Sequence, residues 1–293
     1  GQDNKERIMY IGSGCSEAWF RNAPQSLSGQ GAASVLRSLV DEYETADGVA
    51  LKNLPAAERE KLEKNPLEVA RDPRLYATVV MPGDNTSFLN YVYEPFKDGG
   101  ADQVGKVGAS RTGYWAKKFL DEQDRASGSG SLYFPLYRYA EVLLGYVEAM
   151  NEMEGSYTDE EAQVTVTRDV DQMVSYFNQI RYRAGQPGIT AADASDQAKM
   201  RDLIKHERQI EFAFEGQRFW DLRRWKDAYE AYNRPVRGLD VSASQSQREQ
   251  FYTERVWNTE KTMKRVFSNK MYLWPLDRNV LRKNGKLVQN PGW

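Results

Sequence analysis

The chain has 293 residues, of which 40% are hydrophobic and 28% are charged, a balance that is typical of a soluble globular protein with a sizeable core. Its formal net charge of −2 creates no field that favours nucleic acid or an anionic membrane. One Cys excludes an internal disulfide framework, and one His argues against a zinc site or a His-based catalytic triad.

The first half of the chain is rich in loops. Short apolar runs predict strands, and Gly, Ser, Pro and Asn clusters predict the segments between them. The expected elements are, in chain order, a strand over 7–11, a loop over 12–33, a helix over 34–48 with Ser34 as its N-cap, a charged helix over 55–64, strand-like runs over 75–81 and 113–119, and a long polar loop over 84–113.

Two of these loops carry aromatic side chains among polar ones. Trp and Tyr offer flat apolar faces with a polar edge, which suits the surface of a sugar or of a protein. The alternative is that such rings pin a loop to the body of the protein. The candidate ligand-binding residues are Trp19, Phe20 and Arg21 in the first loop and Asn90, Tyr91 and Tyr93 in the second, with Trp257 as a weaker candidate.

The second half is predicted to be helical. A linker-like stretch over 125–131 precedes two amphipathic helices, over 136–153 and 167–184, whose apolar residues recur at helical spacing. Together they predict an antiparallel pair of the tetratricopeptide kind, which needs further partners to bury its faces. Beyond residue 237 the chain is irregular, with a strand-like run over 271–274 and one short terminal helix.

The segment 201–226 is the densest in apolar anchors and paired charges. It predicts one helix, or two helices joined near Gly216. Glu207, Glu211 and Glu215 share one face, as paired catalytic carboxylates do, but a structural role is favoured because arginines are close in sequence. Those arginines are Arg208, Arg218, Arg223 and Arg224. The aromatic residues assigned to the core are Trp115, Phe219, Trp220, Trp225 and Trp274.

Several motifs resemble the SusD/RagB family of outer-membrane nutrient-binding lipoproteins. The segment 206–225, HERQIEFAFEGQRFWDLRRW, is similar to the signature helix of that family. Further motifs follow the family in order: ARDPRLYATVVMPG (70–83), TGYWAKKFLDEQ (112–123), LYRYAEVLLGYVEAMNE (136–152), FNQIRYRAGQPGIT (177–190) and LWPLDRNVLRKNGKLVQNPGW (273–293). The resemblance is to the C-terminal part of a family member, because the lipidation Cys and the early helical repeats have no match in this chain.

The resemblance implies binding without catalysis. Family members sit on the cell surface, anchored in the outer membrane by an N-terminal lipid, and serve polysaccharide utilization. They pass glycans, or in one branch peptides, to a SusC-like TonB-dependent transporter. It implies no nucleic acid, cofactor or metal, and membrane contact only through a lipid. We expect the targeting segment and the lipid to lie outside this chain.

The expected fold is mainly α, with irregular loops, a few short strands, tetratricopeptide-like helix pairs and a loop-rich subdomain. We expect one SusD-like region over 1–293, made of a loop-rich part over 1–131, a helical scaffold over 132–230 and a terminal part over 231–293. The binding loops vary between family members, so the candidate residues rest on composition alone. The alternative functions are a helical-repeat scaffold for protein partners and a peptide-binding member of the same family.

Overall fold

The computed structural model describes residues 5–14, 17–31, 33–83, 91–103, 105–120, 131–240, 246, 248–252, 254–256 and 265–293. Its contacts group the chain into two compact units. The first unit contains Gly1–Glu215 and Arg237–Arg255, and the second contains Gly216–Val236 and Val256–Trp293. The expected division near residues 131 and 230 stays a prediction.

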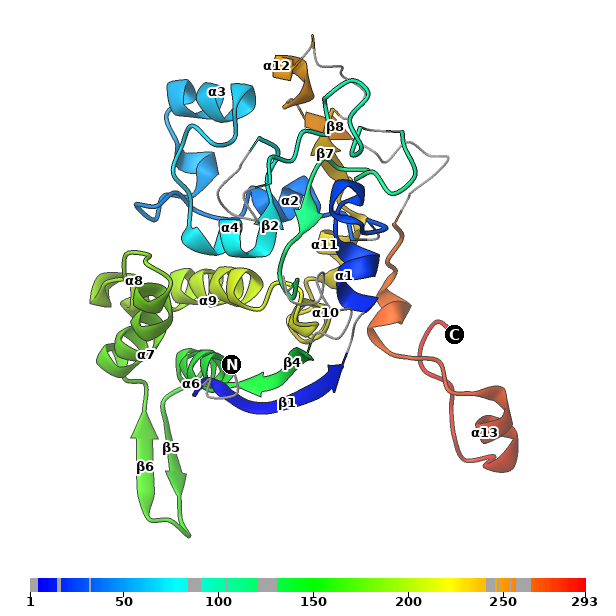
Figure 1. The fold of residues 1–293 in the computed structure, drawn as a ribbon. Coiled ribbons are helices and arrows are strands. Elements are labelled where there is room, and N and C mark those ends of the chain that lie inside the picture. Colours follow the sequence, from blue (N-terminus) through cyan, green and yellow to red (C-terminus); the bar gives the residue numbers. More distant parts are fainter. Residues whose placement is uncertain are drawn as a thin grey trace. The chain divides into compact units, whose positions relative to one another are not determined.

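The first unit begins with short elements joined by irregular segments (Figure 1). These elements are β1 (Arg7–Gly14), α1 (Glu17–Asn22), η1 (Gln25–Leu27), α2 (Arg37–Val40), η2 (Leu51–Asn53), α3 (Ala56–Lys64), α4 (Pro73–Thr78), β2 (Val79–Val80), β3 (Trp115–Ala116) and β4 (Ser131–Arg138). Strand β1 pairs antiparallel with β4, and β2 pairs antiparallel with β3. Helix α4 begins after Asp72, whose side chain accepts a hydrogen bond from the backbone N–H of Arg74.

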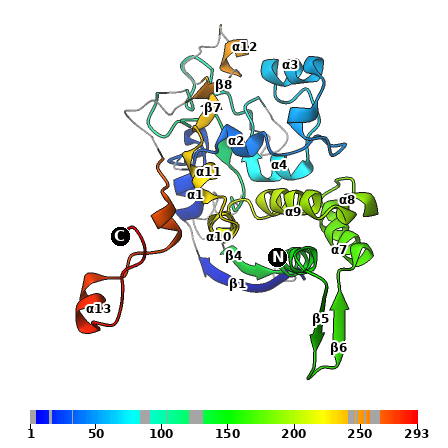
Figure 2. The ribbon, with the colours of Figure 1, turned by 180° about the vertical axis from the view of Figure 1, so that it is seen from behind.

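A helical part of the first unit contains a large buried core. Its helices are α6 (Tyr139–Asn151), α7 (Val170–Arg183), α8 (Ala191–Ser195) and α9 (Gln197–Glu211). Helix α6 packs on α7, as the sequence predicts, and also on α9. Leu143, Val147 and Met150 of α6 meet Met173 and Phe177 of α7 in one buried cluster. In both views α4 lies beside α9, which brings the loop-rich and helical parts together (Figures 1 and 2).

A hairpin that the sequence analysis missed separates α6 from α7. It consists of β5 (Ser156–Asp159) and β6 (Val164–Thr167), which pair antiparallel and extend away from the helices (Figure 1). Thr158 and Thr165 lie opposite each other, with their hydroxyl oxygens 3.0 Å apart. Residues 156–167 alternate polar and β-branched types, a pattern that favours a strand but is easily overlooked between two strong helices.

The first unit also includes β7 (Arg237–Leu239) and α12 (Arg248–Phe251). Strand β7 pairs with β8 (Glu254–Val256), and Phe251 and Tyr252 are buried. The second unit contains α10 (Gln217–Arg224), α11 (Ala228–Asn233), η4 (Asn269–Tyr272) and α13 (Arg278–Lys283). Its small core is formed by Leu222, Ala228 and Phe267.

The predicted joint in the segment 201–226 is confirmed. Helix α9 ends at Glu211, and Gly216 precedes α10 with a φ of 83°, in the left-handed region. Glycine adopts this backbone conformation without the steric cost that a Cβ adds. The mainly helical architecture with irregular segments and a few short strands confirms the predicted fold class. No described helix is long and apolar enough to cross a membrane.

The helix predicted over 34–48 is wrong, because α2 covers only Arg37–Val40. The guanidinium of Arg71 donates hydrogen bonds to the carbonyl oxygens of Val40 and Tyr43, so these carbonyls are held in an irregular turn by a distant residue. Ser34 is not an N-cap, and its hydroxyl oxygen accepts a hydrogen bond from the backbone N–H of Arg111 instead. These tertiary contacts override the local pattern.

Other boundaries also differ from the predictions. The predicted loop over 12–33 contains α1 and η1, the strand over 75–81 is α4 followed by the two residues of β2, and the strand-like run over 271–274 overlaps η4. Tyr139 and Val142, which the apolar pattern of α6 includes, are exposed. Trp115 is buried as predicted, whereas Trp220 is 58% exposed and Trp274 is 63% exposed, so the prediction that both lie in the core is wrong.

Candidate functional site

Helix α1 places the first three candidate residues in different environments. Trp19 is 3% exposed, and its Nε1–H donates a hydrogen bond to the carbonyl oxygen of Leu27 at 2.9 Å. Phe20 is 51% exposed, and Arg21 is also exposed. Successive side chains on a helix point about 100° apart, so one neighbour faces the core while the next faces solvent. The burial of Trp19 supports a packing role, whereas Phe20 and Arg21 lie at the surface.

The two tyrosines of the second group also differ in burial. Tyr93 is buried, and its ring lies 6.4 Å from that of Trp115 in an edge-to-face arrangement. Tyr91 is only partly buried. The burial of Tyr93 supports a packing role, and Tyr91 is the residue of this pair with an accessible side chain. Asn90 and Trp257 lie outside the described residues.

A polar cluster joins Tyr91 to the segment that follows α1. The Tyr91 hydroxyl donates a hydrogen bond to the carboxylate of Asp102. The backbone N–H of Ser26 donates to the same carboxylate at 3.0 Å, and the Ser26 hydroxyl contacts both side chains. Burial and the hydrogen bond to Asp102 raise the pKa of Tyr91, so its hydroxyl stays protonated at neutral pH. The cluster therefore fixes the Tyr91 ring in place.

The turn after η1 closes tightly over the buried aromatic residues. Gly31 has a φ of 62°, and a Cβ at this position would lie 1.9 Å from an atom of the Trp115 ring. The backbone N–H of the exposed Gln30 donates a hydrogen bond to the carbonyl oxygen of Phe20. Phe20 therefore projects from a segment that is fixed on both sides. Phe20, Arg21 and Gln30 are therefore exposed residues on a segment that buried contacts hold in place.

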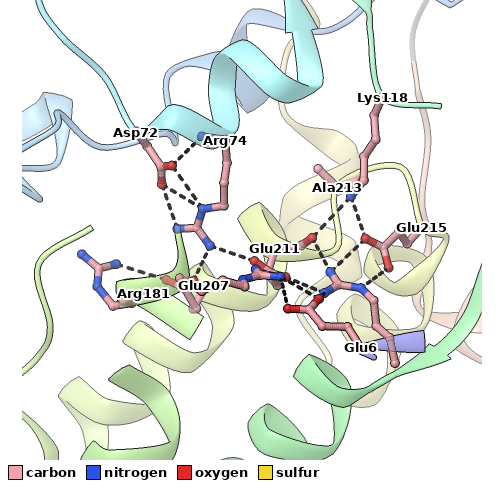
Figure 3. Close-up of polar contacts among 11 residues, drawn as sticks. Glu6, Asp72, Arg74, Lys118, Arg181, Glu207, Glu211, Ala213 and Glu215 are labelled. Carbon is pink, nitrogen blue, oxygen red and sulfur yellow. Dashed lines mark hydrogen bonds and ion pairs between the residues drawn. The ribbon is translucent and has the colours of Figure 1, made fainter. Parts of the chain in front are cut away.

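Three glutamates of the α9 region form a second group of functional interest. Glu207, Glu211 and Glu215 are all buried; Glu207 and Glu211 lie one turn apart on α9 as predicted, whereas Glu215 follows the end of that helix. Figure 3 shows Glu207 and Glu211 turned toward Arg74 of α4. The Arg74 guanidinium lies 2.5 Å from a carboxylate oxygen of Glu207 and 3.0 Å from one of Glu211. Arg181 of α7 approaches Glu207 from the other side at 3.1 Å.

Arg138, at the end of β4, connects the other two carboxylates. It lies 2.6 Å from Glu211 and 2.8 Å from Glu215. Lys118 adds a further cation at 2.6 Å from Glu215 and donates a hydrogen bond to the carbonyl oxygen of Ala213 (Figure 3). Arg183 contacts Glu211 at 2.5 Å. The ion-pair partners described for these glutamates thus come from α4, β4, α7 and Lys118, and not from the four sequence neighbours that were predicted.

The charged side chains of this group are paired with one another. Burial alone would raise the pKa of Glu211, but Arg138, Arg183 and Arg74 outweigh this effect and hold its pKa at about 2. Burial lowers the pKa of Lys118, although Glu215 opposes the shift. Each of the three carboxylates has at least two cationic partners, which is typical of a scaffold and not of a catalytic acid or base. Among the described residues, no group of His, Cys, Asp and Glu is placed to hold a metal ion.

Comparison with known proteins identifies the family. The model of the SusD family matches residues 2–293. SusD-like protein P2 of Formosa agariphila is 30% identical over 171 residues, which are 56% of this chain and 26% of that protein. A SusD-like protein of Bacteroides fragilis NCTC 9343 has a similar crystal structure, with a TM-score of 0.71 and 27% identity.

A second crystal structure from the same strain, described as a SusD-like carbohydrate binding protein, matches with a TM-score of 0.73 and 26% identity. The two structural matches cover 100% and 97% of this chain but 55% of each relative. The chain therefore spans about half the length of these solved relatives, and the segment of it that matches the Formosa protein covers about a quarter of that protein. Because the family model matches almost every residue, the chain belongs to the SusD family.

Proposed function

We propose that this chain belongs to a cell-surface protein that binds oligosaccharides or polysaccharides without catalysis and delivers them to a TonB-dependent outer-membrane transporter. The binding surface is the loop-rich part around α1, where Phe20 and Arg21 project beside the turn at Gln30 and where Tyr91 is held by Asp102. The single observation that carries this proposal is the exposed ring of Phe20 on a base of buried aromatic residues.

The chemistry of this surface suits a sugar. The apolar face of a pyranose ring packs on an exposed aromatic face, and guanidinium and amide groups hydrogen-bond to its hydroxyl groups. Rigid placement matters, because a loop that must become ordered on binding loses part of the interaction energy. The buried rings of Trp19, Tyr93 and Trp115 provide that rigidity.

Membership of the SusD family supports the cellular role. A solved relative of 26% identity is described as a carbohydrate binding protein, which favours glycans over other ligands. Location at the outer membrane through an N-terminal lipid, and a SusC-like transporter as partner, are the roles that the family resemblance implies. The ion pairs that hold Glu207, Glu211 and Glu215 support the proposal that these carboxylates are structural.

Affinity electrophoresis against a panel of neutral and acidic soluble polysaccharides tests the proposal. We expect the chain to be retarded by at least one polysaccharide, in proportion to the amount of polysaccharide in the gel. The same preparation is titrated with a mixture of short peptides. Retardation by none of the polysaccharides, together with binding of peptides, would contradict glycan binding and favour the peptide-binding alternative.

A further inference from the structure

A cavity of about 640 Å³ lies within the first unit, beside the buried glutamates. Its volume falls in the range of small-molecule binding sites. Phe119, Tyr133 and Pro135 provide apolar walls, and Glu6, Arg138 and Arg183 provide charged groups. The glycan-binding surface proposed above does not include any of these residues. The cavity is therefore a second place in the same unit where a ligand fits.

Among the residues that the structure describes, the charges that line this cavity and those of their ion-pair partners are balanced only when Glu6 is counted. The lining contains the cations Arg7, Arg74, Lys118, Arg138 and Arg183 and the carboxylates Glu6, Glu211 and Glu215. Ion pairs extend the group to Asp72, Glu207, Arg181 and Glu44. With these included, the cations and the carboxylates are equal in number. Displacement of the Glu6 side chain leaves the group one negative charge short.

Glu6 differs from the other carboxylates that line the cavity in its accessibility. Its side chain is 34% exposed, whereas Glu211 and Glu215 are buried. One guanidinium nitrogen of Arg183 lies 2.8 Å from both carboxylate oxygens of Glu6, and Arg138 lies 3.7 Å away. The Arg183 side chain is itself 39% exposed. An ion pair with this much exposure is weakly held, because solvent screens it.

We propose that this cavity binds a carboxylate-bearing sugar, a uronic acid residue of a glycan, whose carboxylate replaces that of Glu6 beside Arg183 and Arg138. Arginine recognises carboxylates through paired N–H donors, and the aromatic side chains of Phe119 and Tyr133 line the cavity beside them. Glu6 then acts as a competitor contributed by the chain itself. This inference rests on the proposed glycan-binding function and adds a substrate class to it.

Isothermal titration of the whole chain tests the cavity with α-1,4-linked trigalacturonic acid. The matched control ligand is the same trisaccharide after reduction of its carboxyl groups, and a short N-acetylated peptide with a free C-terminal carboxylate tests the other source of this chemistry. We expect the acidic sugar to bind, its affinity to fall with ionic strength, and the other two ligands to bind at least about tenfold more weakly. Equal binding of the acidic and the reduced sugar, or tighter binding of the peptide, overturns the proposal.

Single substitutions distinguish ligand binding in this cavity from ligand binding at the loop surface. Arg183→Ala is expected to weaken trigalacturonate binding by about tenfold or more, and Arg183→Lys by less, because hydrogen bonds to a charged partner are lost. Glu6→Gln is expected to tighten binding by up to about fivefold, because the competing carboxylate is removed. Unfolding does not produce such a gain. Glu94→Gln, which alters an exposed pair with Lys97, is the matched control and should change nothing.

The outcomes for the two proposals are distinguishable. Phe20→Ala should leave trigalacturonate binding unchanged, because Phe20 does not line the cavity. Weaker binding in Glu6→Gln, or loss of binding in Phe20→Ala but not in Arg183→Ala, overturns the cavity while leaving the loop surface intact. Binding of neutral polysaccharides without any binding of the acidic trisaccharide also overturns the cavity proposal and leaves the loop surface intact.

Discussion

At the scale of single residues, neighbours in the sequence perform different tasks. Trp19 and Phe20 are adjacent aromatic residues, and the sequence predicts both as candidate ligand-binding residues. Helix α1 directs Trp19 into a cluster with Tyr93 and Trp115 and leaves Phe20 in solvent. The sequence could nominate these aromatic residues, but it could not separate them, because their environments depend on residues distant in the chain.

Alanine substitutions of Trp19 and Phe20 should have different effects on the free energy of unfolding. We expect Trp19→Ala to lower the free energy of unfolding by about 3–5 kcal/mol, because it removes a large buried ring. Phe20→Ala should change it by no more than about 0.5 kcal/mol, because the ring is half exposed. Urea titration followed by circular dichroism measures both values. Similar losses in the two variants would show that Phe20 is also a packing residue.

The pH dependence of stability should report on Glu211. Its pKa is held at about 2, below the ordinary 4.5. A carboxylate with a lowered pKa in the folded state stabilises the protein above pH 4.5, and this contribution is lost as the pH falls from 4.5 toward 2. The shift corresponds to ~3 kcal/mol of stability.

Glu211→Gln tests this assignment. The variant should be less stable at neutral pH, and its unfolding free energy should fall less steeply between pH 4.5 and pH 2 than that of the parent chain. Glu230→Gln, which changes an exposed carboxylate paired with Arg234, should keep the slope of the parent. The same slope in all three proteins would mean that another group controls acid stability.

At the scale of elements, spacing predicts what is local and fails where distant contacts decide. The apolar periodicity of α6 and α7 and the break at Gly216 follow from short-range physics, and both are confirmed. The spacing of Glu207, Glu211 and Glu215 predicts their common face but not their partners, which come from α4, β4 and α7. The prediction of a helix over 34–48 fails for the same reason, since the guanidinium of Arg71 donates a hydrogen bond to the carbonyl oxygen of Val40 in α2.

Two glycines in helical segments should respond oppositely to alanine. Gly216 has a φ of 83°, and no atom lies within 4 Å of the position of an added Cβ, so Gly216→Ala should cost about 1 kcal/mol through backbone strain alone. Gly145 lies within α6 in open space, and Gly145→Ala should stabilise the chain by up to about 1 kcal/mol. Thermal unfolding measures both, and a stabilising effect of Gly216→Ala would contradict the assigned conformation.

At the scale of the whole molecule, the motifs identify the family, and we propose that the loop-rich part determines what is bound. The order of the motifs predicts the SusD family, which is confirmed over residues 2–293. The same motifs form the scaffold, in which Glu207 and Glu215 are held by ion pairs with Arg74 and Arg138. Phe20 and Arg21 lie on the short helix α1 and Tyr91 on an irregular segment, beside buried contacts such as that of Tyr93 with Trp115. Composition could identify these loops as the place to look, but it could not show which side chains are exposed.

The most direct test of glycan binding at the loop surface compares two exposed aromatic residues. The equilibrium binding constant for the most strongly retained polysaccharide is measured for Phe20→Ala and for Tyr157→Ala, which alters an exposed ring on the β5–β6 hairpin. We predict that Phe20→Ala weakens binding by about threefold to tenfold, the effect of one lost aromatic contact, while Tyr157→Ala leaves it unchanged. Unchanged binding in Phe20→Ala, or weaker binding in Tyr157→Ala alone, would contradict the assignment of the binding surface to the loops around α1.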